Sequence, residues 1–148
     1  MDAILIASNQ AVVAPMPARP ATRALRILLA DDSPLDRRII QELLRRLGAV
    51  ADVAADGNEA ADAASDKPYD LVLMDILMPH LDGLEAAKRI IARLPPGKAP
   101  RIVAITGDPL LASPERCRQA GMAAYLAKPV RPEQLKAILD AAAEARRP

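Results

Sequence analysis

The sequence predicts an α/β protein with a doubly wound, five-stranded parallel sheet flanked by five helices. Two observations carry this prediction. Short apolar runs alternate five times with segments of helical periodicity after residue 25, which is the pattern of repeated βα units. The chain has 148 residues, of which 51% are hydrophobic and 26% charged, and this composition fits one globular domain with a single core.

The first βα unit begins with the strand LRILLA at 25–30. In the following segment, SPLDRRIIQELLRRLG, apolar residues recur at helical spacing, at Leu35, Ile39, Ile40, Leu43, Leu44 and Leu47. Ser33 is placed to cap this helix, Pro34 fits its first turn, and Gly48 suits its C-terminal end.

The other units follow the same alternation. Strands are predicted at 50–55 (VADVAA), 69–74 (YDLVLM), 101–106 (RIVAIT) and 124–127 (AYLA). Helices are predicted at 58–65, 84–94, 113–122 and 131–145. The segment PPGKAP breaks the third helix, while Ser113 and Gly121 bound the fourth.

The domain is expected to span 24–148, and residues 1–23, rich in Ala and Pro, to form a flexible tail or linker. No run reaches the length of a membrane-spanning helix, and Asp2 stands where a signal peptide carries a cation, so a cytoplasmic location is the expectation. The formal net charge of +1 gives no reason to expect nucleic acid or a membrane surface as partner.

Polar side chains end or directly follow four of the five predicted strands. These residues are Asp31 and Asp32, Asp75, Thr106 and Lys128. Because parallel strands joined by right-handed crossovers all point the same way, their C-terminal ends share one edge of the sheet. Ligands bind at that edge in open α/β folds, so we expect these five residues to form one site.

The residue types in this set are those of phosphoryl transfer. Three acids raise one another's pKa unless a cation relieves the repulsion, and Mg²⁺ prefers a few carboxylate oxygens, a carbonyl and waters. Lys128 supplies a positive charge and Thr106 a donor for an incoming anion. One acid is then left as the nucleophile, because a carboxylate can accept a phosphoryl group to give an acyl phosphate.

These motifs, in this order, resemble the receiver domain of two-component response regulators over about 25–145. The matching features are the pair Asp31 and Asp32, the strand end MD with Asp75, the MP of Met78 and Pro79, the DG of Asp82 and Gly83, Thr106, and the KP of Lys128 and Pro129. The resemblance implies a flavodoxin-like fold and a signalling switch that catalyses its own phosphorylation and dephosphorylation and is not otherwise an enzyme.

The resemblance also implies residue roles. Asp75 is the acceptor of a phosphoryl group from the phosphohistidine of a histidine kinase or histidine phosphotransfer protein. Mg²⁺ is held by Asp31, Asp32, Asp75 and the backbone carbonyl of Leu77. The Lys128 to Pro129 bond is expected to be cis.

A switch is implied at Thr106 and Tyr125. The hydroxyl of Thr106 moves toward phosphorylated Asp75, and Tyr125 fills the vacated space. This change remodels a face for a downstream protein partner, formed by the segments 113–122, 124–127 and 131–145. Formation of a homodimer is left open.

Two other readings stay open. A pseudoreceiver would be an interaction module that is never phosphorylated, but its hallmark, loss of an acid or the lysine, is absent here. A phosphatase with an aspartyl-phosphate intermediate usually carries a second Asp two positions after the nucleophile, where this chain has Leu77. The chain ends directly after the last predicted helix, so we expect it to act through a partner or as a module, for instance of a hybrid sensor kinase.

Overall fold

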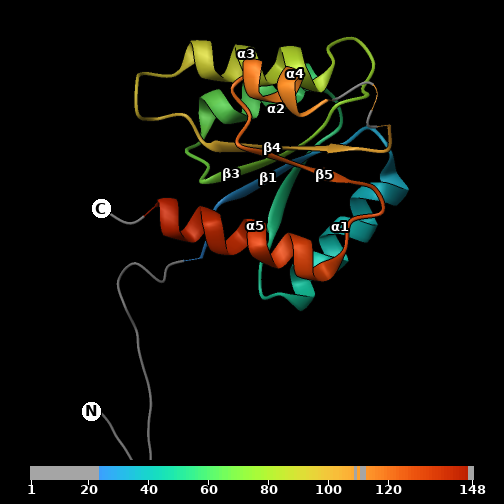
Figure 1. The fold of residues 1–148 in the computed structure, drawn as a ribbon. Helices are drawn as coiled ribbons and strands as arrows, with labels where there is room; N and C mark the ends of the chain where they lie inside the picture. Colours follow the sequence, from blue (N-terminus) through green and yellow to red (C-terminus); the bar gives the residue numbers. More distant parts are fainter. Residues whose placement is uncertain (1–23, 109, 111–112, 147–148) are drawn as a thin grey trace, which may run out of the picture.

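The computed structural model describes residues 24–108, 110 and 113–146 (Figure 1). Within these described residues, five strands form one parallel sheet in the order β2-β1-β3-β4-β5. They are β1 (Ile27–Ala30), β2 (Ala51–Ala54), β3 (Leu71–Asp75), β4 (Arg101–Thr106) and β5 (Ala124–Ala127). The predicted doubly wound α/β fold is confirmed.

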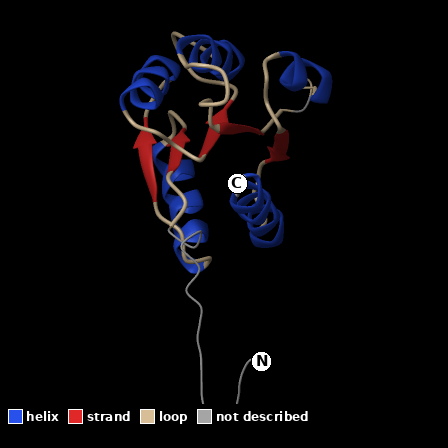
Figure 2. Ribbon diagram, turned by 90° about the vertical axis from the view of Figure 1, so that its left-hand side faces the viewer, coloured by secondary structure: helices blue, strands red, loops and turns tan. Residues whose placement is uncertain are grey.

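Five helices of the described part of the chain cover the two faces of the sheet. They are α1 (Pro34–Arg46), α2 (Gly57–Asp66), α3 (Gly83–Arg93), α4 (Pro114–Gln119) and α5 (Pro132–Ala145). Helices α1 and α5 lie on one face and α2, α3 and α4 on the other, as Figures 1 and 2 show. Each face therefore has its own apolar core, because side chains of a strand alternate between the two faces.

The helix ends follow the signals in the sequence. The Ser33 hydroxyl accepts a hydrogen bond from the backbone N–H of Asp36 at 3.2 Å, and Pro34 opens α1. Gly48 and Gly121 take positive φ angles of 82° and 89° just after α1 and α4. Helix α4 is shorter than the predicted 113–122, since the chain leaves the helix at Ala120 before the left-handed Gly121.

The position of a strand in the sheet explains how strongly apolar its sequence is. All residues of β1 and all five of β3 are buried, because these strands lie inside the sheet between helical layers. Strand β2 lies at the edge, and its Asp52 and Val53 are exposed. The weaker apolar pattern of β2 is the pattern that an edge position permits.

The loop between β3 and α3 is tightly packed. The N–H of Gly83 donates to the carbonyl of Ile76 at 2.9 Å. A β-carbon at Gly83 would lie well inside van der Waals contact with the carbonyl oxygen of Asp75, and 2.8 Å from the α-carbon of Ile76. His80, exposed in the same loop, has a positive φ of 69°. The backbone after Asp75 is thus fixed by close backbone packing.

Two further expectations concern the N-terminal tail and the absence of membrane-spanning segments. The tail predicted at 1–23 lies outside the described residues. Within the described part of the chain, no helix combines the length and the hydropathy that crossing a bilayer requires.

Candidate phosphoryl-transfer site

Three acids meet at the C-terminal edge of the sheet, as expected from the strand ends. Asp31 directly follows β1, and Asp75 is the last residue of β3, which pairs with β1. One carboxylate oxygen each of Asp31, Asp32 and Asp75 lies within 4.8 Å of the other two. Asp31 and Asp75 are buried and Asp32 is exposed, because adjacent residues of an extended chain point in opposite directions.

Lys128 is the cation of this cluster. Its Nζ lies 3.0 Å from Oδ2 of Asp31, 2.8 Å from Oδ2 of Asp36 and 3.7 Å from Oδ2 of Asp75. Burial lowers the pKa of Lys128, but the hydrogen bonds to Asp36 and Asp31 and the charge of Asp75 outweigh it, so the pKa is raised overall. Lys128 therefore stays protonated, and the bond to Pro129 is cis as expected.

The carboxyl group of Asp75 is poorly stabilised in its charged form. Its burial, and then the neighbouring charge of Asp31, raise its pKa to about 7. Lys128 and the backbone N–H of Leu77, which donates to Oδ1 at 3.3 Å, act in the opposite direction. A perturbed acid at the mouth of a sheet is typical of a functional site.

Asp31 is held more firmly than Asp75. Its Oδ1 accepts from the backbone N–H of Ser33 at 2.9 Å, and its Oδ2 accepts from Lys128 at 3.0 Å. Arg37 of α1 donates to its backbone carbonyl at 2.7 Å. Asp31 therefore has a fixed orientation before any ligand binds.

Thr106 and Tyr125 lie where the sequence expects them, at the end of β4 and in β5. The buried hydroxyl of Thr106 donates to the backbone carbonyl of Asp108 at 3.0 Å and accepts from its N–H at 3.0 Å. Tyr125 is half-buried against the core under α4, in a hollow that Cys117 and Met122 also line. In this structure the Thr106 hydroxyl is thus engaged with its own loop.

Sequence reasoning missed Asp36 as a member of the site. Asp36 lies in the first turn of α1, and its contact with Lys128 joins residues that are 92 positions apart in the sequence. No local pattern reports such a contact. The only available signal was that an acid at this turn faces the same edge as the strand ends.

The donor set fits a hard divalent cation. The three carboxylates are close enough to share one ion, either directly or through its waters, and Mg²⁺ commonly keeps several waters beside one or two carboxylates. The exposed position of Asp32 leaves one side of the cluster open to solvent. The role of the Leu77 carbonyl as a ligand stays a prediction.

Comparison with known proteins agrees with this geometry. The sequence model of the response regulator receiver domain matches residues 27–140. The signal transduction histidine-protein kinase BarA of Escherichia coli is 34% identical over 116 residues, which cover 78% of this chain and 12% of BarA. The chain therefore spans about an eighth of the length of this relative.

Solved structures agree as well. The receiver domain of sensor histidine kinase PA1611 from Pseudomonas aeruginosa PAO1, crystallised with magnesium coordinated in the active site cleft, is 36% identical with a TM-score of 0.74, covering 82% of this chain and 99% of that one. A co-crystal structure of the Saccharomyces cerevisiae phosphotransfer protein Ypd1 with the Ssk1 receiver domain matches with 25% identity and a TM-score of 0.69, covering 78% of this chain and 86% of that one. This chain belongs to the response regulator receiver domains of phosphorelay signalling.

Proposed function

We propose that the protein accepts a phosphoryl group on Asp75 and passes the change to a partner protein. The observation that carries the proposal is the placement of Lys128, whose Nζ lies among the carboxylates of Asp31, Asp36 and Asp75. A cation next to a desolvated carboxylate at an open sheet edge is suited to bind and orient a phosphoryl group.

In the proposed reaction, a carboxylate oxygen of Asp75 attacks the phosphorus of a phosphohistidine. The new P–O bond forms as the P–N bond breaks, and the electron pair returns to the imidazole of the donor. Lys128 bears its charge 3.7 Å from Asp75, so it can follow the phosphoryl oxygens while remaining near Asp31. Asp31 and Asp32 would hold Mg²⁺ with Asp75 and the Leu77 carbonyl, and the ion would neutralise charge on the acids and the phosphoryl oxygens.

The proposed switch begins at Thr106. Its hydroxyl must leave the backbone of Asp108 to bind the phosphoryl group, because both of its hydrogen bonds are with Asp108. The half-buried Tyr125 then turns toward the space near Thr106. The face made by α4, β5 and α5 changes shape, and a downstream protein reads it.

A protein with a phosphohistidine is the proposed donor. Its docking is supported by apolar side chains beside the site: Leu35 and Ile39 of α1 are 67% and 49% exposed. Ile39 also lines a hollow of about 280 Å³ together with Lys128 and Val130. An exposed apolar rim next to the reactive carboxylate suits a helical partner that presents a histidine.

Incubation with Mg²⁺ and acetyl phosphate tests the function. We expect a phosphoryl adduct by intact mass that hydrolyses on standing, and amide NMR shifts around Thr106 and Tyr125 with beryllofluoride. Asp75→Asn should abolish the adduct, whereas Asp62→Asn, a substitution of an exposed acid of α2, should leave it unchanged. Absence of both the adduct and the shifts would favour an unphosphorylated interaction module, and steady turnover of unrelated phosphate esters would favour a phosphatase.

Lys128→Ala tests the coupling between phosphorylation and the switch. We expect Mg²⁺ binding to stay largely intact, because the three acids remain, while beryllofluoride no longer changes the ring signals of Tyr125. Lys136→Ala, which removes an exposed lysine paired with Asp140, is the matched control and should keep the Tyr125 response. An unaltered response in Lys128→Ala would contradict the role given to the lysine.

A further inference from the structure

Another hollow lies at the N-terminal ends of the strands, at the end of the sheet opposite Asp75. It has a volume of about 490 Å³ and is bounded by the starts of β3 and β4, the loop before β4, and the C-terminal end of α5. In Figure 1 this loop and this helix end lie at the left, whereas the strands point to the right. The volume is within the range of about 300–1,000 Å³ of small-molecule sites.

Cationic side chains outnumber acids in this hollow, which we name the basal hollow. Three cations, Lys98, Arg101 and Arg146, line it with one acid, Asp70. Asp70 pairs with Arg146, with 3.3 Å between Oδ2 and Nη1, and it also accepts a hydrogen bond from the backbone N–H of Arg26. Within the described residues, no carboxylate neutralises Lys98 or Arg101, so the basal hollow carries an excess of positive charge.

Arg101 adds an unsatisfied donor. Its Nε is buried and, among the described residues, has no hydrogen-bond partner. A buried donor without a partner is unfavourable, and a guanidinium cannot avoid this cost by losing its proton. Arg101 lines the basal hollow, and its guanidinium can make two parallel hydrogen bonds to one oxyanion bound there.

The backbone around the basal hollow does not cancel its preference for an anion. The C-terminal end of α5 contributes a negative dipole end, equivalent to roughly half an elementary charge, which opposes anion binding. The two charges of Lys98 and Arg101, which no carboxylate among the described residues neutralises, exceed this half charge. Gly97 and Gly121 line the wall, and at Gly97 even an added β-carbon would meet no atom within 4 Å, so a ligand can approach this part of the backbone.

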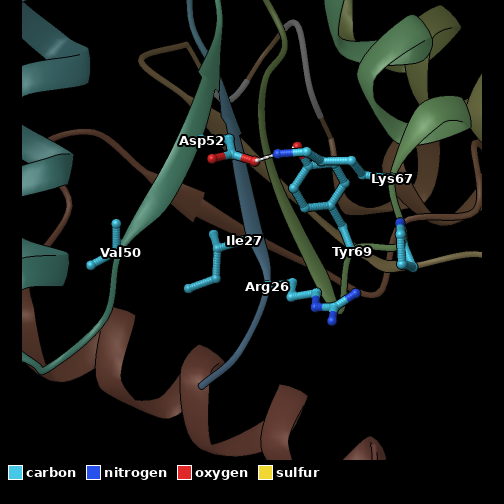
Figure 3. A pocket seen from close by; sticks show the side chains of 7 residues that line it. Arg26, Ile27, Val50, Asp52, Lys67 and Tyr69 are labelled. Carbon is cyan, nitrogen blue, oxygen red and sulfur yellow. Dashed lines mark hydrogen bonds and ion pairs between the residues drawn. The ribbon is translucent and has the colours of Figure 1, made fainter. Parts of the chain in front are cut away.

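A neighbouring hollow of about 330 Å³ differs from the basal hollow in how its charged side chains are paired (Figure 3). There Asp52 accepts hydrogen bonds from Tyr69 at 2.6 Å and from Lys67 at 3.1 Å, and the three side chains lie together. Its acid and its lysine are therefore already paired with each other. In the basal hollow, no acid among the residues that the structure describes pairs with Lys98 or Arg101 in this way.

We propose that the basal hollow binds a small organic phosphate, with the phosphate held by Arg101 and Lys98 and the organic part in the remaining volume. Orthophosphate would fill a fraction of 490 Å³, which is why we assign a larger phosphate ester, such as a nucleoside monophosphate. This site is separate from Asp75 and does not depend on phosphorylation.

The test uses the full chain with EDTA present. Without a divalent cation, the acids around Asp75 repel anions, so binding at the basal hollow is observed alone. We expect titration with adenosine 5′-monophosphate, and separately with pyrophosphate, to give saturable amide shifts at Gly97, Lys98 and Gly121. Affinity for both ligands should fall about tenfold in Arg101→Gln, because a charge-assisted hydrogen-bonded pair is lost.

Two further variants complete the test. Lys98→Gln changes an exposed loop residue and should weaken binding without disturbing the core. Lys136→Gln removes an equal charge from the exposed side of α5 and should leave the affinity within about twofold, since exposed charges several turns away are screened. The proposal is overturned if neither ligand gives saturable shifts at millimolar concentration, or if Arg101→Gln and Lys98→Gln bind as tightly as Lys136→Gln.

The two ligands distinguish the source of the phosphate. Tighter binding of the nucleotide than of pyrophosphate assigns an organic phosphate, and tighter binding of pyrophosphate assigns an inorganic oxyanion and overturns the organic assignment. Acetyl phosphate labelling of Asp75 in Arg101→Gln should match that of the unaltered protein. The basal hollow and the function proposed for Asp75 can therefore fail independently.

Discussion

Gly83→Ala is expected to lower the free energy of unfolding by about 3 kcal/mol. The added β-carbon would overlap the carbonyl group of Asp75 and the α-carbon of Ile76. These are backbone atoms at the end of a fully buried strand, so no flexible side chain can turn away to make room. Urea unfolding followed by far-UV circular dichroism measures the loss, and the midpoint should fall with little change in the slope.

Gly107→Ala is the matched control for this substitution. Gly107 has no atom within 4 Å of an added β-carbon and does not have a positive φ, although it lies at the same edge of the sheet. We expect its free energy of unfolding to change by less than about 1 kcal/mol, in either direction. Equal losses in the two variants would contradict the packing role assigned to Gly83.

Asp75→Asn is expected to raise the free energy of unfolding of the metal-free protein, on the order of 3 kcal/mol above neutral pH. In the native state, burial and the charge of Asp31 raise the pKa of Asp75 to about 7 from a usual value of 3.8. The native state therefore binds the proton more tightly than the unfolded chain. Its stabilising contribution is complete below about pH 4 and is lost as the pH rises through about 7.

Urea unfolding in EDTA across this pH range measures the effect. The advantage of Asp75→Asn should be small near pH 4, grow as the pH rises and level off above about pH 7. Asp140→Asn, which changes an acid with a 68% exposed side chain, should shift stability little at any pH. A less stable Asp75→Asn protein at pH 8 would show that the carboxylate is better compensated than its surroundings indicate.

Much of the fold follows from local patterns. The periodicity of α1, the caps at Ser33 and Ser113, and the apolar runs of β1 and β3 are properties of neighbouring residues, so the sequence reports them directly. The order of the strands depends on which strands pair across long stretches of chain, and periodicity carries no record of it. Helix α4 ends earlier than the predicted range 113–122, although the stop indicated by Gly121 is present, since the chain leaves the helix at Ala120 and Gly121 has a positive φ.

For the candidate site too, some features follow from the local sequence and others do not. The strand ends alone predict that Asp31, Asp75 and Lys128 lie at one edge, because parallel strands share their direction. Which acids are buried, and that Asp36 also holds Lys128, depend on distances between residues far apart in the chain. Such distances are set by packing of whole elements.

The placement of the ring-bearing side chains has a practical consequence for spectroscopy. The chain contains two tyrosines, one histidine, and neither phenylalanine nor tryptophan. Tyr125 lies beside α4, His80 in the loop that follows Asp75, and Tyr69 by the hollow of Figure 3. In D₂O, where exchange removes amide proton signals, the ring signals of a one-dimensional proton spectrum should therefore come from only these three side chains, giving one probe for each place.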